Sequence, residues 1–425
     1  MGNTLFTNVR IFDGTGEHPY LGEVLVQGNR IKHVGRGSRT VPANGHTVID
    51  GAGATLMPGM TEAHTHFSWN NAGSLDAIFR MPPEEHTLLA ATNAKMYLDM
   101  GFTSCVGAAA AKPRLDVVIR NAINSGQIPG PRYLANSQEI GTLGGLGDTN
   151  PPHVDVRELS FGWIVTGPEE MRKAVRMFIK YGVDLIKLNL SGEDMTDCAA
   201  EETPMSDEEV AMAVKEAKRR KLRLCAHARS AESVKMCVRH GIEIIYHASY
   251  ADEEALDMLE ANKDKFFVGP GIGWLVNTSR NAGPWGIKPD SPLGIQYARE
   301  LEIAVECMRK MHRRGIRVLP GGDYGFAWTP HGTNAKDLEY FVDMIGISPM
   351  DTLLAATKHG GAIMGRPNEL GQVKPGYLAD ILLVDGDPLA NIRILQDRKR
   401  ILAVMKDGTF HRAPEMSAQR QRIAV

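Results

Sequence analysis

The chain has 425 residues, of which 43% are hydrophobic and 23% charged, and its formal net charge of −2 does not favour a nucleic acid or an anionic membrane as partner. Its five cysteines are scattered, and no apolar run reaches the length of about 18 residues that a membrane span needs, so we expect neither a disulfide framework nor a transmembrane helix. Because no signal peptide is recognisable, we expect a cytoplasmic protein, unless a leader has been removed.

The two ends of the chain share a pattern of short runs in which apolar and polar residues alternate. Residues 1–57 contain short runs in which apolar and polar residues alternate between glycines and asparagines. The same pattern returns in "GYLADILLVDGDP" and "RILAVMKDGTFHR" near the C-terminus. Such runs are typical of strands joined by turns. We therefore predict that residues 1–57 and 367–425 pair into one small β-sandwich, into which the middle of the chain is inserted.

The middle, residues 58–366, alternates apolar runs with helical patterns. Helices are predicted at 168–182, 206–221 and 252–263, and Ser206 with Glu209 three residues later is typical of a helix start. The eight predicted strands are residues 56–62, 101–108, 131–140, 183–190, 222–228, 242–250, 265–272 and 316–325. Eight alternating units predict an α/β fold in which a parallel sheet closes into a (β/α)₈ barrel.

Metal-ligating and charged side chains follow several of these strands. Catalytic groups of a (β/α)₈ barrel lie at the C-terminal ends of its strands. Each such residue alone is most simply a hydrogen-bonded polar group, but together they favour a metal site at the barrel mouth. These residues are His64 and His66 after the first strand, Lys187 in the fourth, His227 and His247 in the fifth and sixth, and Asp323 in the eighth.

Lys187 is the most informative of these residues, because it interrupts the apolar run "DLIKLNL". A buried ammonium is costly unless it is paired or neutralised. A lysine that reacts with CO₂ becomes an anionic carbamate, whose two oxygens can bridge two cations. The predicted arrangement is a first metal on His64, His66 and Asp323, a second on His227 and His247, and a carbamate on Lys187 with a hydroxide between them. Such nitrogen and oxygen ligands suit Zn²⁺, with Mn²⁺, Co²⁺ or Fe²⁺ possible.

Three longer motifs point to a family. "PGMTEAHTHF", "VDLIKL" and "LGQVKPGYLADILLVDGDPL" (370–389) resemble motifs of the amidohydrolase superfamily of metal-dependent hydrolases. The chain is most similar to its branch of imidazolonepropionase-like dipeptidases and carboxypeptidases, which includes ochratoxin-type amidases and phenylurea hydrolases. The resemblance implies the same six metal ligands. It also implies hydrolysis of an amide C–N bond by a metal-bridging hydroxide, with Lys187 and Asp323 as catalytic residues.

The residues that would bind the substrate are hypotheses of lower specificity. Asp323 is expected to take the proton of the hydroxide and pass it to the leaving amine. Arg229, two residues after His227, could bind a substrate carboxylate bidentately, or it could pair with an acidic neighbour such as Glu232. Leu146 stands in "GGLGD", where peptidase-like relatives often carry histidine, and this predicts a bulky or aromatic substrate. Further candidates for the pocket are His153 as a replacement for that histidine, Tyr250 and Trp274.

Two other functions stay open at this stage. A carbamate or phenylurea hydrolase would act on neutral aryl substrates and would need no carboxylate-binding arginine. A deaminase of the same superfamily would use one metal and no bridging lysine. In every case we expect a small-molecule substrate and, as the default for such enzymes, a homo-oligomer.

Overall fold

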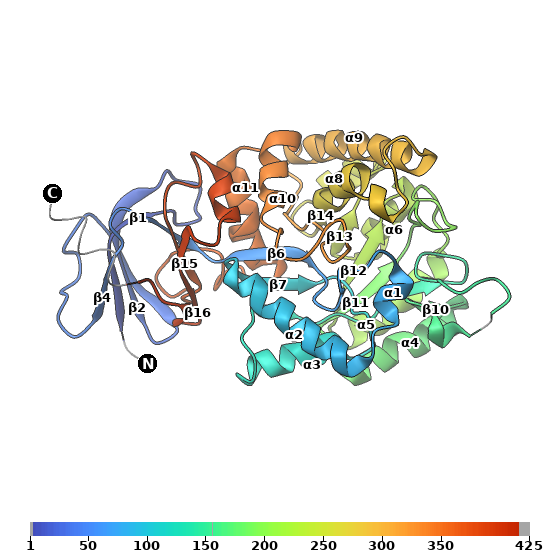
Figure 1. The fold of residues 1–425 in the computed structure, drawn as a ribbon, viewed down its shortest axis with the longest axis horizontal. Coiled ribbons are helices and arrows are strands. Elements are labelled where there is room, and N and C mark those ends of the chain that lie inside the picture. The colour runs from blue at the N-terminus through green and yellow to red at the C-terminus, as the bar shows by residue number, and fades with distance from the viewer. Residues whose placement is uncertain (1–2, 155, 416–425) are drawn as a thin grey trace.

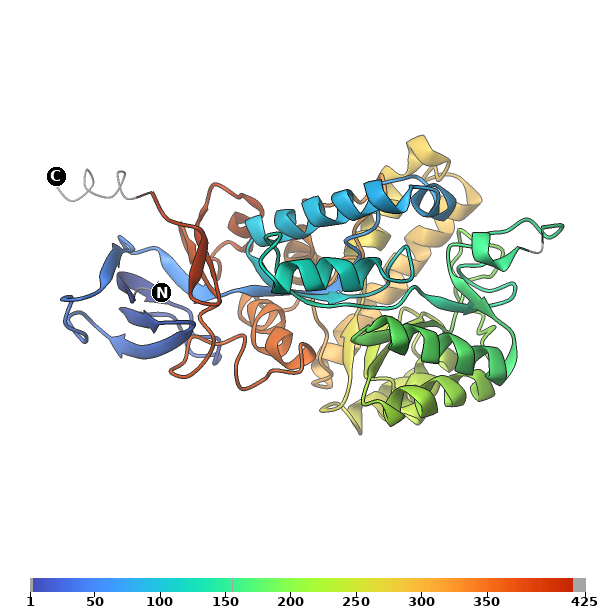
Figure 2. The same ribbon diagram turned by 90° about the horizontal axis from the view of Figure 1, so that it is seen from below.

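The computed structural model describes residues 3–154 and 156–415, and it separates the chain into two parts along its long axis (Figures 1 and 2). A sheet built from both chain ends lies at one end, and a helix-covered barrel lies at the other. No helix in the described part of the chain has the length and apolar character that crossing a bilayer requires.

The sheet of the chain ends is continuous and has eight strands, in the order β17-β16-β15-β5-β1-β2-β3, with β4 paired to β1. Its strands are β1 (Thr4–Ile11), β2 (Tyr20–Gln27), β3 (Arg30–Arg36), β4 (Thr47–Asp50), β5 (Thr55–Pro58), β15 (Ile381–Val384), β16 (Ile401–Lys406) and β17 (Thr409–Arg412). β15 joins the two ends because it pairs with β5 on one side and with β16 on the other. The boundaries 1–57 and 367–425 stay a prediction, and residues 1–2 and 416–425 lie outside the described ones.

The barrel begins directly after this sheet, because only Gly59 separates β5 from the first barrel strand. A parallel bridge between Asn136 and Leu185 connects the three-stranded sheet of β6, β7 and β8 to the sheet that contains β11. The regular barrel strands are β6 (Met60–Thr65), β7 (Phe102–Gly107), β8 (Arg132–Leu134), β11 (Leu185–Asn189), β12 (Arg223–Ala228), β13 (Ile244–His247) and β14 (Phe267–Gly269).

An irregular segment, residues 316–320, closes the barrel between β14 and β6. The Leu319 N–H donates to the Val268 carbonyl over 2.9 Å, and the Ala63 N–H donates to the Pro320 carbonyl over 3.2 Å. The eighth predicted strand is therefore in place, but it is much shorter than residues 316–325. Pro320 has no N–H to donate, and the two glycines that follow it favour a turn over a strand.

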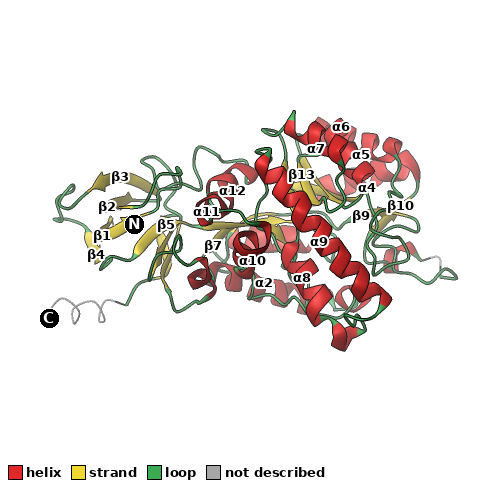
Figure 3. Ribbon diagram, turned by 90° about the horizontal axis from the view of Figure 1, so that it is seen from above, coloured by secondary structure: helices red, strands yellow, loops and turns green. Residues whose placement is uncertain are grey.

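Helices surround the barrel on its outside (Figure 3). Ser206 caps the helix that follows it, and the Glu209 side chain completes a capping box, as predicted. The helices are α1 (Leu75–Phe79), α2 (Pro83–Asp99), α3 (Leu115–Asn124), α4 (Gly167–Tyr181), α5 (Asp207–Arg219), α6 (Ala231–His240), α7 (Glu253–Glu260), α8 (Ile272–Asn281), α9 (Pro292–Arg313), α10 (Lys336–Tyr340), α11 (Pro349–Ala356) and α12 (Lys358–Ile363). Shorter helical segments are η1 (Arg157–Leu159), η2 (Gly283–Trp285), η3 (Phe341–Ile345) and η4 (Ile392–Gln396).

Two further short strands extend the sheet beside β11. β9 (Ile140–Thr142) pairs with β11, and β10 (Trp163–Val165) pairs with β9, in both cases in parallel. The chain between these two strands contains the "GGLGD" loop. This extension places the loop beside the C-terminal end of β11.

Candidate metal centre

The six ligand-type residues predicted from the sequence come together in one pocket at the C-terminal ends of the barrel strands. Each is at most 5% exposed, so their side chains form the floor of the pocket. They are His64 in β6, His66 directly after it, Lys187 in β11, His227 in β12, His247 at the end of β13, and Asp323 after the closing segment.

Asp323 lies against the two histidines of the first barrel strand. Its Oδ1 is 3.1 Å from His66 Nε2 and 3.5 Å from His64 Nε2. One ligand atom from each of His64, His247 and Asp323 lies within 4.8 Å of the other two. Burial alone would raise the pKa of Asp323, but the His64 and His66 rings hold it well below its usual range.

Backbone carbonyls orient two of the histidine rings. His66 Nδ1 lies 3.0 Å from the Ala109 carbonyl, and His227 Nε2 lies 2.9 Å from the Gly192 carbonyl. A carbonyl can only accept, so each of these ring nitrogens carries a proton when the bond is made. The other nitrogen of each neutral ring, Nε2 of His66 and Nδ1 of His227, then keeps a lone pair for a metal. Metal-ligating histidines are commonly fixed in this way.

Lys187 lies among neutral and acidic groups. Its side chain is 2% exposed, and its Nζ lies 4.5 Å from the centre of the Tyr246 ring. Burial lowers the pKa of this ammonium, although the nearby Cys225 and Glu139 act in the opposite direction. A lowered pKa raises the fraction of neutral amine, which is the form that reacts with CO₂.

The unpartnered atoms of the pocket floor fit a divalent cation. Buried polar atoms in proteins almost always have a hydrogen-bond partner, and an exception calls for an explanation. The described part of the chain supplies no such partner for His64 Nδ1 and His247 Nδ1, and His66 Nε2 and Asp323 Oδ1 have only the contacts with each other and with His64 given above. Imidazole nitrogens and a carboxylate oxygen are suitable ligands for Zn²⁺ and its neighbours.

The backbone at the floor is also unusual. His247, Ala248 and Asp323 adopt positive φ angles of 74°, 54° and 59°, a region that residues other than glycine seldom occupy. Gly271 approaches so closely that a Cβ there would lie 3.0 Å from His247 Nδ1. Backbone strain of this kind clusters at functional sites, where the surrounding structure maintains it.

The walls of the pocket are largely aromatic and apolar. The Trp69 ring stacks on the His66 ring, with centroids 3.6 Å apart and an interplanar angle of 10°. Leu146 and Trp274, both predicted pocket residues, do line the pocket. The other wall residues are Leu75, Met195, Phe326, Glu139 and Glu193. The walls therefore offer mainly apolar surface to a ligand above the metal ligands.

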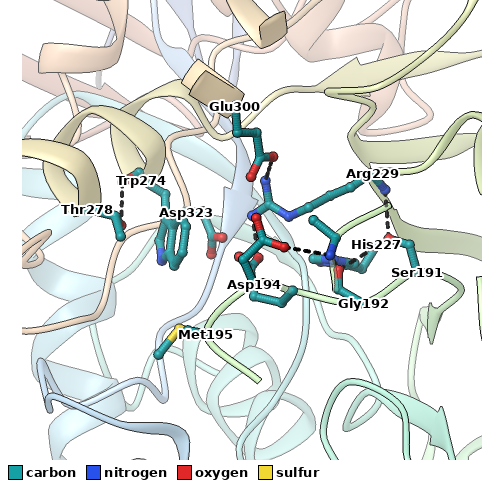
Figure 4. A network of polar contacts seen from close by, with 12 residues as sticks. Ser191, Gly192, Asp194, Met195, His227, Arg229, Trp274, Thr278, Glu300 and Asp323 are labelled. Carbon is teal, nitrogen blue, oxygen red and sulfur yellow. Dashed lines mark hydrogen bonds and ion pairs between the residues drawn. The ribbon is translucent and has the colours of Figure 1, made fainter. Parts of the chain in front are cut away.

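Arg229 is not among the residues that line the pocket. It is completely buried, and its guanidinium forms an ion pair of 2.5 Å with Glu193. A second ion pair of 2.5 Å joins it to Glu300 (Figure 4). The backbone N–H of Arg229 also donates to Ser191 Oγ over 2.8 Å. The predicted alternative partner, Glu232, pairs with Arg239 instead. The role of Arg229 in binding a substrate carboxylate stays a prediction, and its charge is already balanced by two carboxylates.

The remaining substrate-binding candidates also lie away from the pocket lining. His153 is exposed, so the structure offers no contact between it and the metal ligands. Tyr250 is half-buried, and its N–H donates to the Arg229 carbonyl. Sequence reasoning missed Glu139 and Glu193, which do line the pocket. Glu139 is a charged residue within a largely uncharged stretch just before β9. A charged residue that interrupts an uncharged run is also the signal by which Lys187 was identified.

A profile of the amidohydrolase family matches residues 55–410, which includes the whole barrel. The chain belongs to the amidohydrolase family. This confirms the resemblance seen in the sequence motifs and the prediction of a hydrolase that acts on carbon–nitrogen bonds. Amidohydrolases generally use divalent metals, in agreement with the His and Asp cluster of the pocket floor.

This amidohydrolase is similar to several characterised proteins. It is 26% identical over 377 residues to ochratoxinase from Aspergillus niger, an alignment that covers 84% of this chain and 76% of the relative. It is 22% identical over 396 residues to imidazolonepropionase from Sphingopyxis alaskensis, which covers 90% and 92% of the two chains. The crystal structure of a Xaa-Pro dipeptidase with bound methionine superposes with a TM-score of 0.85 at 27% identity, covering 97% of this chain and all of the other.

Proposed function

We propose that this amidohydrolase is a binuclear metal-dependent hydrolase that cleaves an amide C–N bond in a bulky or aromatic substrate. The main support is the pocket floor, where buried ligand-type side chains converge and leave nitrogen and oxygen atoms without partners. The proposed ligands are His64, His66 and Asp323 for one ion, His227 and His247 for the other, and a carbamylated Lys187 between them.

Each floor residue has a chemical task in this proposal. Two divalent ions, most suitably Zn²⁺ but also Mn²⁺, Co²⁺ or Fe²⁺, would supply an activated water and a Lewis acid for the substrate carbonyl. Lys187 would take up CO₂ through its buried amine, whose pKa is lowered. Asp323 would accept the proton of the attacking water and pass it to the leaving amine. Its low pKa keeps it ionised, and therefore able to accept a proton, at neutral pH.

The walls support a bulky substrate with an aromatic part. Trp69, Leu146 and Trp274 surround the space above the floor. Burial of a ring against such residues supplies much of the affinity of small-molecule sites. A peptide-like amide or an N-acyl amino acid with an aromatic side chain would offer such a ring, and the similar Xaa-Pro dipeptidase is named for a dipeptide.

One observation favours a second candidate, a carbamate or phenylurea hydrolase that acts on neutral aryl substrates. Among the described residues, Lys187 is the only lysine or arginine that lines the pocket. Arg229, the expected carboxylate ligand, is held by Glu193 and Glu300. A substrate without a carboxylate needs no further cation, so both candidates share the mechanism and differ in the substrate's charge.

The decisive test measures metal content and hydrolysis together. The protein loaded with zinc should contain two ions per chain, and it should hydrolyse aryl amides or ureas only when the metal is present. The variant His66→Asn should lose metal and activity, whereas His18→Asn, at an exposed position of the end sheet, should lose neither. Full activity after complete metal removal would overturn the proposal, and one ion per chain with release of ammonia would instead support a deaminase.

A further inference from the structure

Glu139 is a buried carboxyl group of the pocket that the proposed mechanism does not use. Its side chain lines the same pocket as the six metal-ligand candidates and is 5% exposed. The Trp163 N–H donates to its backbone carbonyl over 2.7 Å, so the chain is fixed beside β9 and β10. In the described part of the chain its Oε1 has no hydrogen-bond partner.

The "GGLGD" loop leaves room for this oxygen. Gly147 has a φ of 94°, and a Cβ at this position would lie 2.9 Å from Glu139 Oε1. Asn189 Nδ2 donates to the Leu146 carbonyl over 3.1 Å and so fastens the loop to the end of β11. The carboxyl is therefore enclosed by a built site, and its unpartnered oxygen is not the result of an open loop.

An unpartnered buried carboxyl oxygen is a place for a donor from a ligand. Burial without a partner destabilises the group, and a ligand N–H in contact with it would remove that cost. Burial also raises the pKa of Glu139 to about 7, against the lowering effects of Lys187 and of a side-chain hydrogen bond with Asn189. A carboxyl group keeps an acceptor oxygen whether or not it is protonated. Glu139 can therefore accept a hydrogen bond across the neutral pH range.

We propose that Glu139 is a specificity-determining residue that accepts a hydrogen bond from an N–H group of the substrate. Among aryl amides and ureas, the pocket then selects those that carry an N–H group. This inference rests on the proposed function, since it names the substrate class of the same pocket.

The test uses binding, so that it does not depend on turnover. Calorimetry on the zinc-loaded protein compares two aryl amines that lack a hydrolysable carbonyl, N-ethylaniline and N-ethyl-N-methylaniline. The first carries an N–H and the second lacks it. N-ethylaniline should bind about tenfold more tightly than its N-methyl analogue, which corresponds to one hydrogen bond to a buried carboxyl.

Two variants and a control assign the preference to Glu139. Glu139→Leu should abolish the difference between N-ethylaniline and N-ethyl-N-methylaniline. Glu139→Gln keeps an acceptor oxygen, so it should retain the preference for N-ethylaniline. Glu201→Gln, at an exposed position, should behave as the wild type. Zinc content should be the same in all four proteins.

The outcomes separate this inference from the proposed function. Equal binding of the N–H and N-methyl probes by the wild type, or a preference that persists in Glu139→Leu, would overturn the role of Glu139. If Glu139→Leu does not fold, Glu139→Ala, which also removes the acceptor oxygens, takes its place, and a preference that persists there refutes the inference. An enzyme that shows the N–H preference but hydrolyses no amide or urea would refute the proposed function alone.

Discussion

Replacement of Arg229 by methionine tests whether this residue supports the structure or binds the substrate. Its guanidinium lies between Glu193 and Glu300, which are 6% and 0% exposed, at 2.5 Å from each. Removing one partner of a buried ion pair costs about 3–5 kcal/mol, because an uncompensated charge stays buried. Since two carboxylates lose their cation here, we expect the free energy of unfolding of Arg229→Met to fall by an amount at the upper end of that range.

The assay is urea unfolding of the zinc-loaded protein at a fixed zinc concentration. The double variant Arg229→Met with Glu300→Gln removes one of the two orphaned charges, so it should recover part of the lost free energy. Arg220→Met, at an exposed position, serves as the matched control and should stay within about 0.5 kcal/mol of the wild type.

A role in substrate binding predicts the opposite pattern. If Arg229→Met keeps the wild-type free energy of unfolding while the KM of carboxylate-bearing substrates rises at least tenfold, the structural reasoning is refuted. The ion pairs would then be exchanged for a substrate carboxylate during the reaction. Measuring both quantities on the same preparation distinguishes the two roles.

Three further predictions concern single groups. Asp323→Asn should lower kcat by about 10³-fold or more while the circular dichroism spectrum is preserved, because its amide cannot accept the proton of the attacking water; a kcat near that of the wild type would refute the proton transfer. Lys187→Ala should bind fewer zinc ions per chain, and added acetate should restore part of the activity because it supplies the carboxylate that the carbamate provides; metal analysis and rescue kinetics check this. Burial lowers the pKa of His331 to about 4, whereas in the unfolded chain it has the ordinary value of about 6.5. Between these two pH values the unfolded chain binds a proton at His331 and the native state does not. The stabilising effect of neutral His331 is therefore complete above pH 6.5 and is lost as the pH falls towards 4, and His331→Gln should show a smaller decrease in the free energy of unfolding over that interval.

Local patterns were sufficient to predict the strand and helix order of the barrel. The runs at 183–190 and 222–228 correspond to β11 and β12, whose residues are nearly all buried and therefore read as continuous apolar sequence. The pairing of β5 with β15 was predictable from the shared pattern of the two chain ends. The length of the last barrel strand was predicted wrongly, because the range 316–325 extended past Pro320 into two glycines, where the structure has no regular strand.

The pocket floor was predictable for a similar reason. A histidine, lysine or aspartate at the end of a barrel strand is visible in the sequence, and the barrel topology brings such strand ends together. The partners of Arg229 were not predictable, because Glu300 is 71 residues away and reaches it from α9. Glu139 was missed because the "SQEIG" stretch does not show which side of a short strand faces the pocket.

The strain and the unpartnered atoms of the floor have one common explanation. His247 and Asp323 each combine a positive φ with a buried ligand atom that lacks a hydrogen-bond partner. Both features destabilise the folded chain, and among the described residues only the contacts of Asp323 with His64 and His66 offset part of that cost. A bound cation would coordinate those atoms and stabilise the folded chain against both effects, because its binding free energy is available only in the folded state. Such a site also has little freedom to relax around other ligands, so in this chain the choice of substrate falls to the walls, which include Leu146 and Glu139.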